Sequence, residues 1–148
     1  YIIAGLLAAL GASDKLLSFT TELPFGSQGN RELLELKLML LLASFVFAYF
    51  KFTWSLRQFN LLSILVGAAP LGKAGEPGID TYAHRSAGAN NLAGDDFNRG
   101  IRAYYFGLAA SGWLLNPIAL AVLALAVLIV LYRRDYRSSA LYILRDRP

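Results

Sequence analysis

The sequence predicts an all-α integral membrane protein: a helical bundle with about three spans in this chain and a cytoplasmic amphipathic helical stretch. Two observations carry this prediction. Of its 148 residues 56% are hydrophobic and 16% are charged, whereas soluble domains lie near 45–50% and about 25%. The apolar residues also gather in long runs with charges at their ends, as they do in membrane proteins. We treat residues 1–148 as one helical membrane domain.

The first apolar run covers residues 1–13 and is about half as long as a span. We interpret it as the second half of a transmembrane helix, and we expect one further span upstream. Asp14 ends the run. The following segment contains the turn formers Pro24, Gly26 and Gly29, which predict a connecting loop.

The second run predicts a long helix over residues 34–69. Residues 34–53 supply the roughly 20 positions that a helix needs to cross about 30 Å of hydrocarbon. Lys51 then reaches an interface, where Trp54 belongs to the aromatic belt. Residues 55–69 lack strong helix breakers. The second half of the helix is therefore expected to project from the bilayer or to lie on it.

The next stretch is polar. Residues 70–80 hold two prolines and three glycines, so they predict a loop. Residues 81–96 are polar but rich in alanine, which favours a short amphipathic helix or two helical turns. Gly88 and Gly94 weaken this helix, because glycine costs about 1 kcal/mol in a helix interior.

Two apolar segments, residues 97–115 and 117–132, predict a helical hairpin across residues 100–132. Pro117 removes a backbone donor and disfavours helical geometry at Asn116, so the turn is placed between them. The alternative is one kinked helix over residues 97–134, which would be about 57 Å long, nearly twice the hydrocarbon core. The hairpin is favoured because it places both arginine-bearing ends on the same side. A basic, interfacial tail follows at residues 133–148.

The hairpin allows the basic residues on each side of the membrane to be counted. One side carries eleven of the 14 lysines and arginines. They are Lys51, Arg57, Lys73, Arg85, Arg99, Arg102, Arg133, Arg134, Arg137, Arg145 and Arg147. The other three are Lys15, Arg31 and Lys37. The positive-inside rule makes the first side, with the C-terminus, cytoplasmic.

A stripe of small residues lies at four-residue spacing on the first helix of the hairpin. It consists of Ala103, Gly107 and Ser111. Small residues let another helix approach closely in a membrane. The stripe therefore predicts helix packing, either within the chain, which we favour, or between two copies.

Basic residues gather where the hairpin leaves the bilayer, and we predict that they contact lipid or a partner. The group consists of Arg99, Arg102, Arg133, Arg134 and Arg137, together with the polar residue Asn98. Such a group can hold anionic lipid headgroups. The alternative for the 98–102 stretch is an ion-pair network, with Asp95 and Asp96, that joins the polar helix to the span.

Residues that would carry chemistry are sparse. His84 is the only histidine and there is no cysteine, so neither a metal site nor a cofactor is expected. The basic residues lie beside spans, which argues against nucleic acid. We place no charged residue well inside a span, and this counts against coupled transport. These features predict a protein that is not an enzyme.

Several ordered motifs carry a family resemblance. They read LGASD, YFKFTWSLRQFN, GAAP, AHR, FNRGIRAYYFGLAASGW and YRRDYRS. Together they resemble a bacterial family of integral membrane proteins known only as a domain of unknown function, DUF599. The resemblance implies a helical inner-membrane protein, with a span before Tyr1 and with residues 98–102 in the signature stretch. It implies no activity and no catalytic residue.

Three functions from different classes follow. The first is a non-catalytic accessory or assembly subunit beside a larger membrane complex, with membrane lipids and other subunits as partners. The second is a channel or transporter for small solutes that acts as an oligomer. The third is a membrane enzyme that would use His84, Asp95, Asp96 and Arg99. We favour the first, in the bacterial inner membrane.

Overall fold

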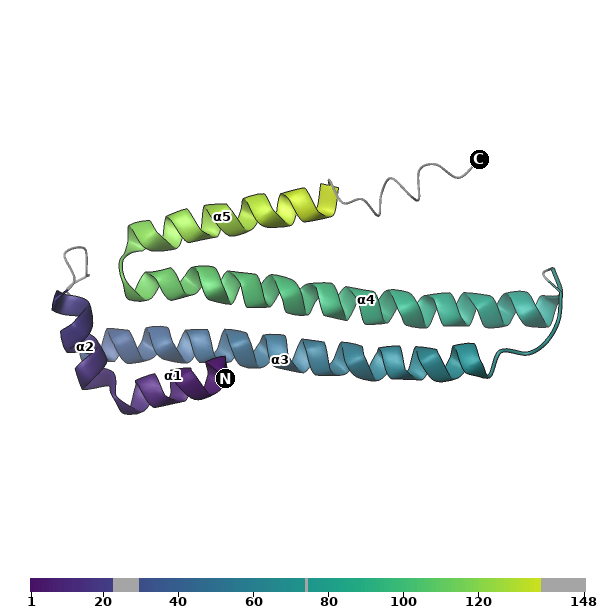
Figure 1. Ribbon diagram of the computed structural model, residues 1–148, viewed down its shortest axis with the longest axis horizontal. Coiled ribbons are helices and arrows are strands. Elements are labelled where there is room, and N and C mark those ends of the chain that lie inside the picture. Colours follow the sequence, from purple (N-terminus) through teal and green to yellow (C-terminus); the bar gives the residue numbers. More distant parts are fainter. Residues whose placement is uncertain (23–29, 74, 137–148) are drawn as a thin grey trace. The chain divides into compact units, whose positions relative to one another are not determined.

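The computed structural model describes residues 1–22, 30–73 and 75–136, and the regular elements in these ranges are all helical. The predicted all-α class is confirmed. Figure 1 shows the helices in chain order. They are α1 (Ile2–Gly11), α2 (Ser13–Glu22), α3 (Arg31–Gly67), α4 (Pro77–Ser111), the 3₁₀ turn η1 (Gly112–Leu114) and α5 (Pro117–Tyr136).

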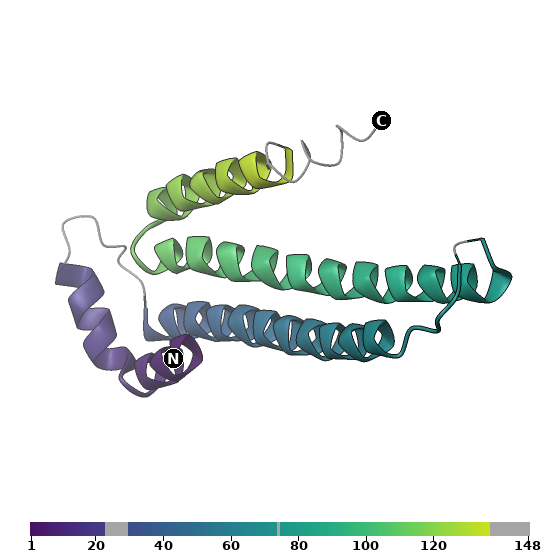
Figure 2. The same cartoon turned by 45° about the vertical axis from the view of Figure 1, so that its right-hand side comes forward.

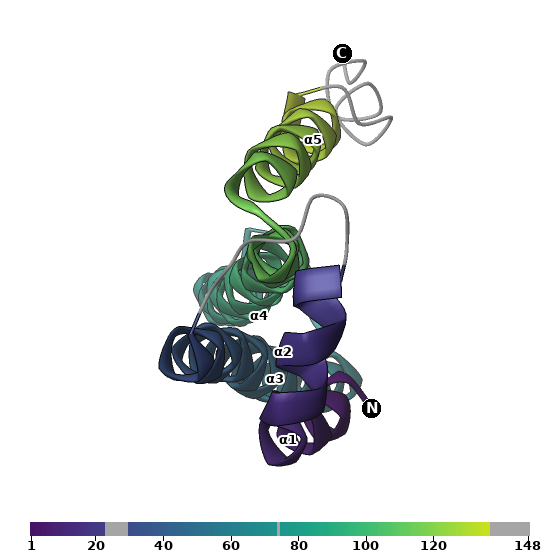
Figure 3. The ribbon, with the colours of Figure 1, turned by 90° about the vertical axis from the view of Figure 1, so that its left-hand side faces the viewer.

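Two of the described helices can cross a membrane by length and composition. They are α3 and the part of α5 from Pro117 to Arg134. The pair α1 and α2, bent by 91°, would give a third crossing if both belong to one span. Figure 3 shows the sharp bend between these two short helices. The membrane class is therefore confirmed, whereas α4 does not pass this test in the described part of the chain.

The chain divides into two compact units, and we describe each by itself. The terminal unit comprises residues 1–45 and 104 onward, and the hairpin unit comprises residues 46–103. Both α3 and α4 contribute residues to each unit.

In the hairpin unit, α3 and α4 pack through positions seven residues apart. Ala48 and Ser55 are buried on α3, and Ala93 and Gly100 are buried on α4. A seven-residue repeat keeps one seam of a helix facing its neighbour. Because the side chains in this seam are small, the two helices approach closely.

The core of the terminal unit lies along the first part of α3. Leu34, Leu38, Leu41 and Phe45 are buried there, and Ala109 of α4 is also buried. The Phe45 ring meets the Tyr104 ring edge-on, with 5.6 Å between their centroids.

The terminal unit also contains the predicted hairpin turn, and Figure 2 shows α5 folding back after the end of α4. Asn116 caps α5, because its side-chain oxygen accepts a hydrogen bond of 2.6 Å from the backbone N–H of Ala119. Pro117 occupies the first position of α5, where its missing N–H costs nothing. A Cβ at Gly112 would lie 3.0 Å from the Ala119 carbonyl, so this tight turn requires glycine.

Two segments differ from the sequence analysis. Residues 16–22 were expected in a loop but belong to α2, because the turn formers begin only at Pro24. The last residues of the predicted loop (77–80), the predicted helical segment 81–96 and residues 97–111 all belong to α4, which runs unbroken from Pro77 to Ser111. Packing on α3 outweighs the cost of Gly88 and Gly94.

Candidate functional site

The main polar cluster of the hairpin unit is centred on Asp96 of α4. Lys51 donates a hydrogen bond of 2.8 Å to one carboxylate oxygen, and Gln58 donates one of 2.8 Å to the other. The Lys51 and Asp96 side chains are 27% and 14% exposed. Because each oxygen already accepts a hydrogen bond, the carboxylate fastens α4 to α3 in this unit.

The same contacts lower the pKa of Asp96 below its ordinary value. The hydrogen bond from Lys51 is the largest cause and that from Gln58 is the second. Partial burial opposes them, while the charges of Lys51 and Arg99 add to the lowering. The carboxylate is therefore held in its ionised form, in which it accepts both hydrogen bonds.

A second polar contact lies next to this cluster and is buried. The Ser55 hydroxyl donates a hydrogen bond of 2.7 Å to the Ala93 carbonyl. On the same seam, a Cβ at Gly100 would lie 3.0 Å from the Phe52 ring. The Phe52 and Phe97 rings meet edge-on, with 5.5 Å between their centroids. Small and aromatic side chains thus alternate where the two helices meet.

The sequence analysis missed the role of Lys37. It counted this residue only among the three basic residues of the second side, but Lys37 lies on the buried face of α3 and is only 6% exposed. Its ammonium group donates a hydrogen bond of 3.0 Å to the Trp113 carbonyl and lies 5.1 Å from the centre of the Trp113 ring. Residue 113 follows the end of α4, where exposed helix carbonyls favour a cation. Lys37 therefore ties the hairpin turn to α3.

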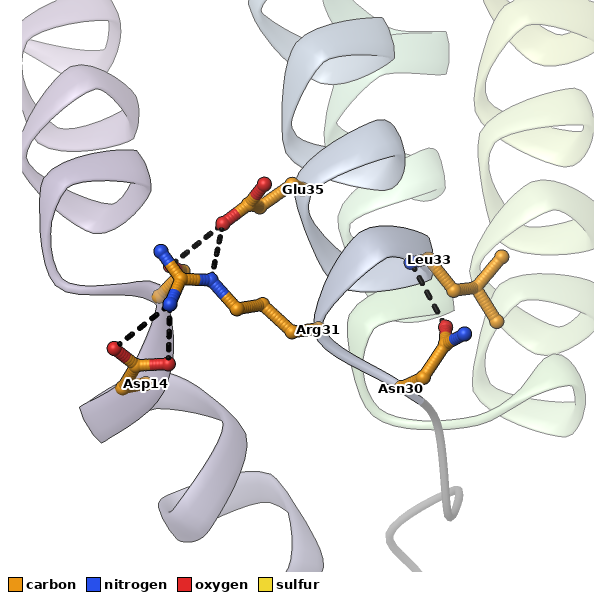
Figure 4. A network of polar contacts seen from close by, with 6 residues as sticks. Asp14, Asn30, Arg31, Leu33 and Glu35 are labelled. Atoms are coloured by element: carbon orange, nitrogen blue, oxygen red, sulfur yellow. Dashed lines mark hydrogen bonds and ion pairs between the residues drawn. The ribbon is translucent and has the colours of Figure 1, made fainter.

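A charged cluster in the terminal unit joins α2 to the start of α3 (Figure 4). The Arg31 guanidinium donates hydrogen bonds to Glu35 at 2.7 Å and to Asp14 at 3.0 Å. Ser13 donates a hydrogen bond of 2.9 Å to the same oxygen of Glu35. Asn30 caps α3, because its side-chain oxygen accepts a hydrogen bond from the Leu33 N–H. The cluster fixes α2 just after its sharp bend from α1.

The predicted basic contact residues fall in different parts of the structure. Asn98, Arg99 and Arg102 have exposed side chains on α4 in the hairpin unit. Arg133 and Arg134 occupy the last turn of α5 in the terminal unit, where cations suit the helix dipole. Arg137 lies outside the described residues. A common rim for these residues stays a prediction.

One member of the predicted small-residue stripe, Gly107, lies in a close contact. Gly107 is buried, and a Cβ there would lie 3.1 Å from the Phe45 ring. Ala103 is half-buried and belongs to the hairpin unit, whereas Ser111 is exposed and donates a hydrogen bond to the Leu108 carbonyl. The seven-residue spacing of Ala93, Gly100 and Gly107 was the better signal for the packing face of α4.

The four residues considered for an enzyme site differ in their exposure. His84, Asp95 and Arg99 are exposed on α4, while Asp96 faces α3. Within the described ranges, no three His, Cys, Asp or Glu side chains are grouped in a way that could hold a metal ion. The ion pair that the structure gives Asp96 is with Lys51 of α3, which was not part of the predicted network.

One comparison identifies the family. The family model described as "Protein of unknown function, DUF599" matches residues 1–140. The chain belongs to the DUF599 family. The resemblance found in the sequence motifs is thereby confirmed. Neither the search of curated proteins nor the search of solved structures found a match for this DUF599 protein.

Proposed function

We propose that this DUF599 protein is a non-catalytic membrane subunit that packs beside a larger membrane protein complex. Its proposed place is the bacterial inner membrane, with a cytoplasmic C-terminus. The distribution of eleven basic residues against three supports that orientation.

The observation that carries the proposal is the hairpin unit. With 37 residues, α3 is about 55 Å long, well above the roughly 30 Å of a hydrocarbon core. The part at and beyond the end of the predicted span is fastened to α4 by contacts of Lys51, Ser55 and Gln58, two of which are with Asp96. It nevertheless keeps large apolar side chains exposed, among them Leu61 and Ile64. The α3–α4 pair is thus held together while one apolar side of it stays uncovered. Such a surface is suited to docking on another membrane protein.

Anionic lipid is the second proposed partner. Arg99, Arg102, Arg133 and Arg134 lie near the ends of the proposed hairpin spans, and Arg137 follows them in the sequence. Each basic residue near an anionic membrane surface contributes about 1 kcal/mol to the attraction. The headgroups would hold the chain at the edge of a complex while its apolar helices face the acyl chains.

The test is isolation of the tagged full chain from its native membrane in a mild detergent, followed by native mass spectrometry. The proposal expects other membrane subunits and bound anionic lipid. Replacing Arg133, Arg134 and Arg137 together with glutamine should weaken this association while the melting temperature stays unchanged. If the chain purifies alone and moves a solute across liposomes, the channel function replaces this one.

A further inference from the structure

A second heptad seam runs along α3, apart from the seam that α4 covers. Its six positions are spaced by three and four residues in turn. They are Phe47, Phe50, Trp54, Arg57, Leu61 and Ile64. The five apolar members are between 53% and 67% exposed, whereas the neighbouring Ser55 of the covered seam is fully buried.

The spacing of these residues indicates what can cover them. Lipid tails accept apolar side chains in any arrangement. An alternation of three and four places these side chains in one stripe along the helix, and a second helix can cover such a stripe because each side chain then fits a hole of that helix. The seam that binds α4 has the same repeat, through Ala48 and Ser55.

The exposed seam also continues past the membrane-length part of α3. A span over residues 34–53 would end near Trp54, yet Leu61 and Ile64 lie about 12 and 16 Å further along the helix axis. At these positions an uncovered side chain would face water or headgroups. Lipid alone therefore does not account for the whole seam.

Arg57 decides the kind of helix that fits. Its guanidinium lies 5.9 Å from the centre of the Trp54 ring, inside the apolar seam. Two copies of the chain in one membrane have the same orientation, so a dimer through this seam would place Arg57 opposite Arg57. Like charges in facing positions oppose association. A different chain with a carboxylate in this layer would instead pair with Arg57.

We infer that this seam of α3 docks a helix of another membrane subunit, one with apolar heptad positions and an Asp or Glu opposite Arg57. This deepens the proposed function and rests on it, because it identifies the surface and the chemistry of the partner.

Site-specific crosslinking in the native membrane tests the inference. The sequence contains no cysteine, so Leu61→Cys introduces a single thiol that a benzophenone maleimide can label. Leu56→Cys is the matched control, because Leu56 is a comparably exposed leucine of α3 that lies off the seam. After irradiation, the crosslinked peptides are sequenced by mass spectrometry.

The inference expects the labelled Leu61→Cys variant, and not the Leu56→Cys variant, to crosslink to a helix of another subunit with a carboxylate in the Arg57 layer. Arg57→Glu should lower recovery of that subunit about tenfold, as loss of one central charged contact does. Replacing the partner's carboxylate with arginine should then restore recovery. The helical content of the Arg57→Glu variant should match that of the parent.

Other outcomes overturn the inference. An adduct of the Leu61→Cys variant with a second copy would make the seam a dimer interface, and an adduct with lipid alone would make it a bilayer surface. If a subunit co-purifies but the two cysteine variants label it equally, this surface is wrong and the proposed function stands. If no subunit co-purifies, both fail.

Discussion

Replacing Gly107 with leucine should destabilise the terminal unit by overfilling the contact between α4 and α3. A Cβ at this position would lie 3.1 Å from one carbon of the Phe45 ring and 3.3 Å from two others. Carbon atoms in good contact are about 3.5–4.0 Å apart, so even the first added carbon is roughly 0.4 Å too close. Leucine adds three further carbons on the same side.

The expected magnitude follows from two opposing contributions. Replacing glycine in a helix interior gains about 1 kcal/mol of helix propensity. For Gly107→Ala this gain roughly offsets the tight contact, so the melting temperature should stay nearly constant. For Gly107→Leu, overpacking costs about 1–3 kcal/mol relative to the same substitution in an open site.

Gly88 supplies the matched control on the same helix. A Cβ at Gly88 has no heavy atom within 4 Å, so Gly88→Leu obtains the propensity gain without the contact. At about 2–4 °C per kcal/mol for a chain of this size, Gly107→Leu should melt roughly 2–12 °C below Gly88→Leu. Thermal unfolding in detergent, followed by tryptophan fluorescence, measures this difference. Equal melting temperatures for the two leucine variants would refute the packing of Gly107 against Phe45.

The remaining predictions concern Asp96, Arg31 and the membrane topology. The fold lowers the pKa of Asp96. The ionised carboxylate therefore stabilises the fold fully above its unfolded pKa of about 4, and this stabilisation is lost as the pH falls through the lower pKa of the folded state. Asp96→Asn should therefore lower the melting temperature at neutral pH and flatten its decline in acid, and an acid profile like that of the parent would contradict this. Arg31→Gln removes the contacts with Asp14 and Glu35. The α2 amides should therefore exchange hydrogen faster, while the overall melting temperature changes little. Unchanged exchange would show that the cluster does not hold α2. In topology labelling, a cysteine at Asn116 should react from the periplasm and one at Ser138 should not. The reverse pattern would overturn the orientation, and labelling of both from one side would overturn the hairpin.

Local sequence determined the class of this protein and its hairpin turn. Long uncharged runs predict membrane helices because a buried backbone must satisfy its own hydrogen bonds. The turn could be found because its signals are adjacent in the chain: Asn116 caps α5 and Pro117 begins it. The motif series likewise indicated the family that the comparison then identified.

Only the tertiary structure decided which residues meet across the helices. Asp96 pairs with Lys51, 45 residues earlier, and a sequence with several acids and bases offers no local sign of that choice. The burial of Lys37 was missed for the same reason, since its partner is the backbone of a turn 76 residues later. The continuity of α4 through Gly88 also depends on α3, because packing against a neighbouring helix supplies the free energy that local propensity lacks.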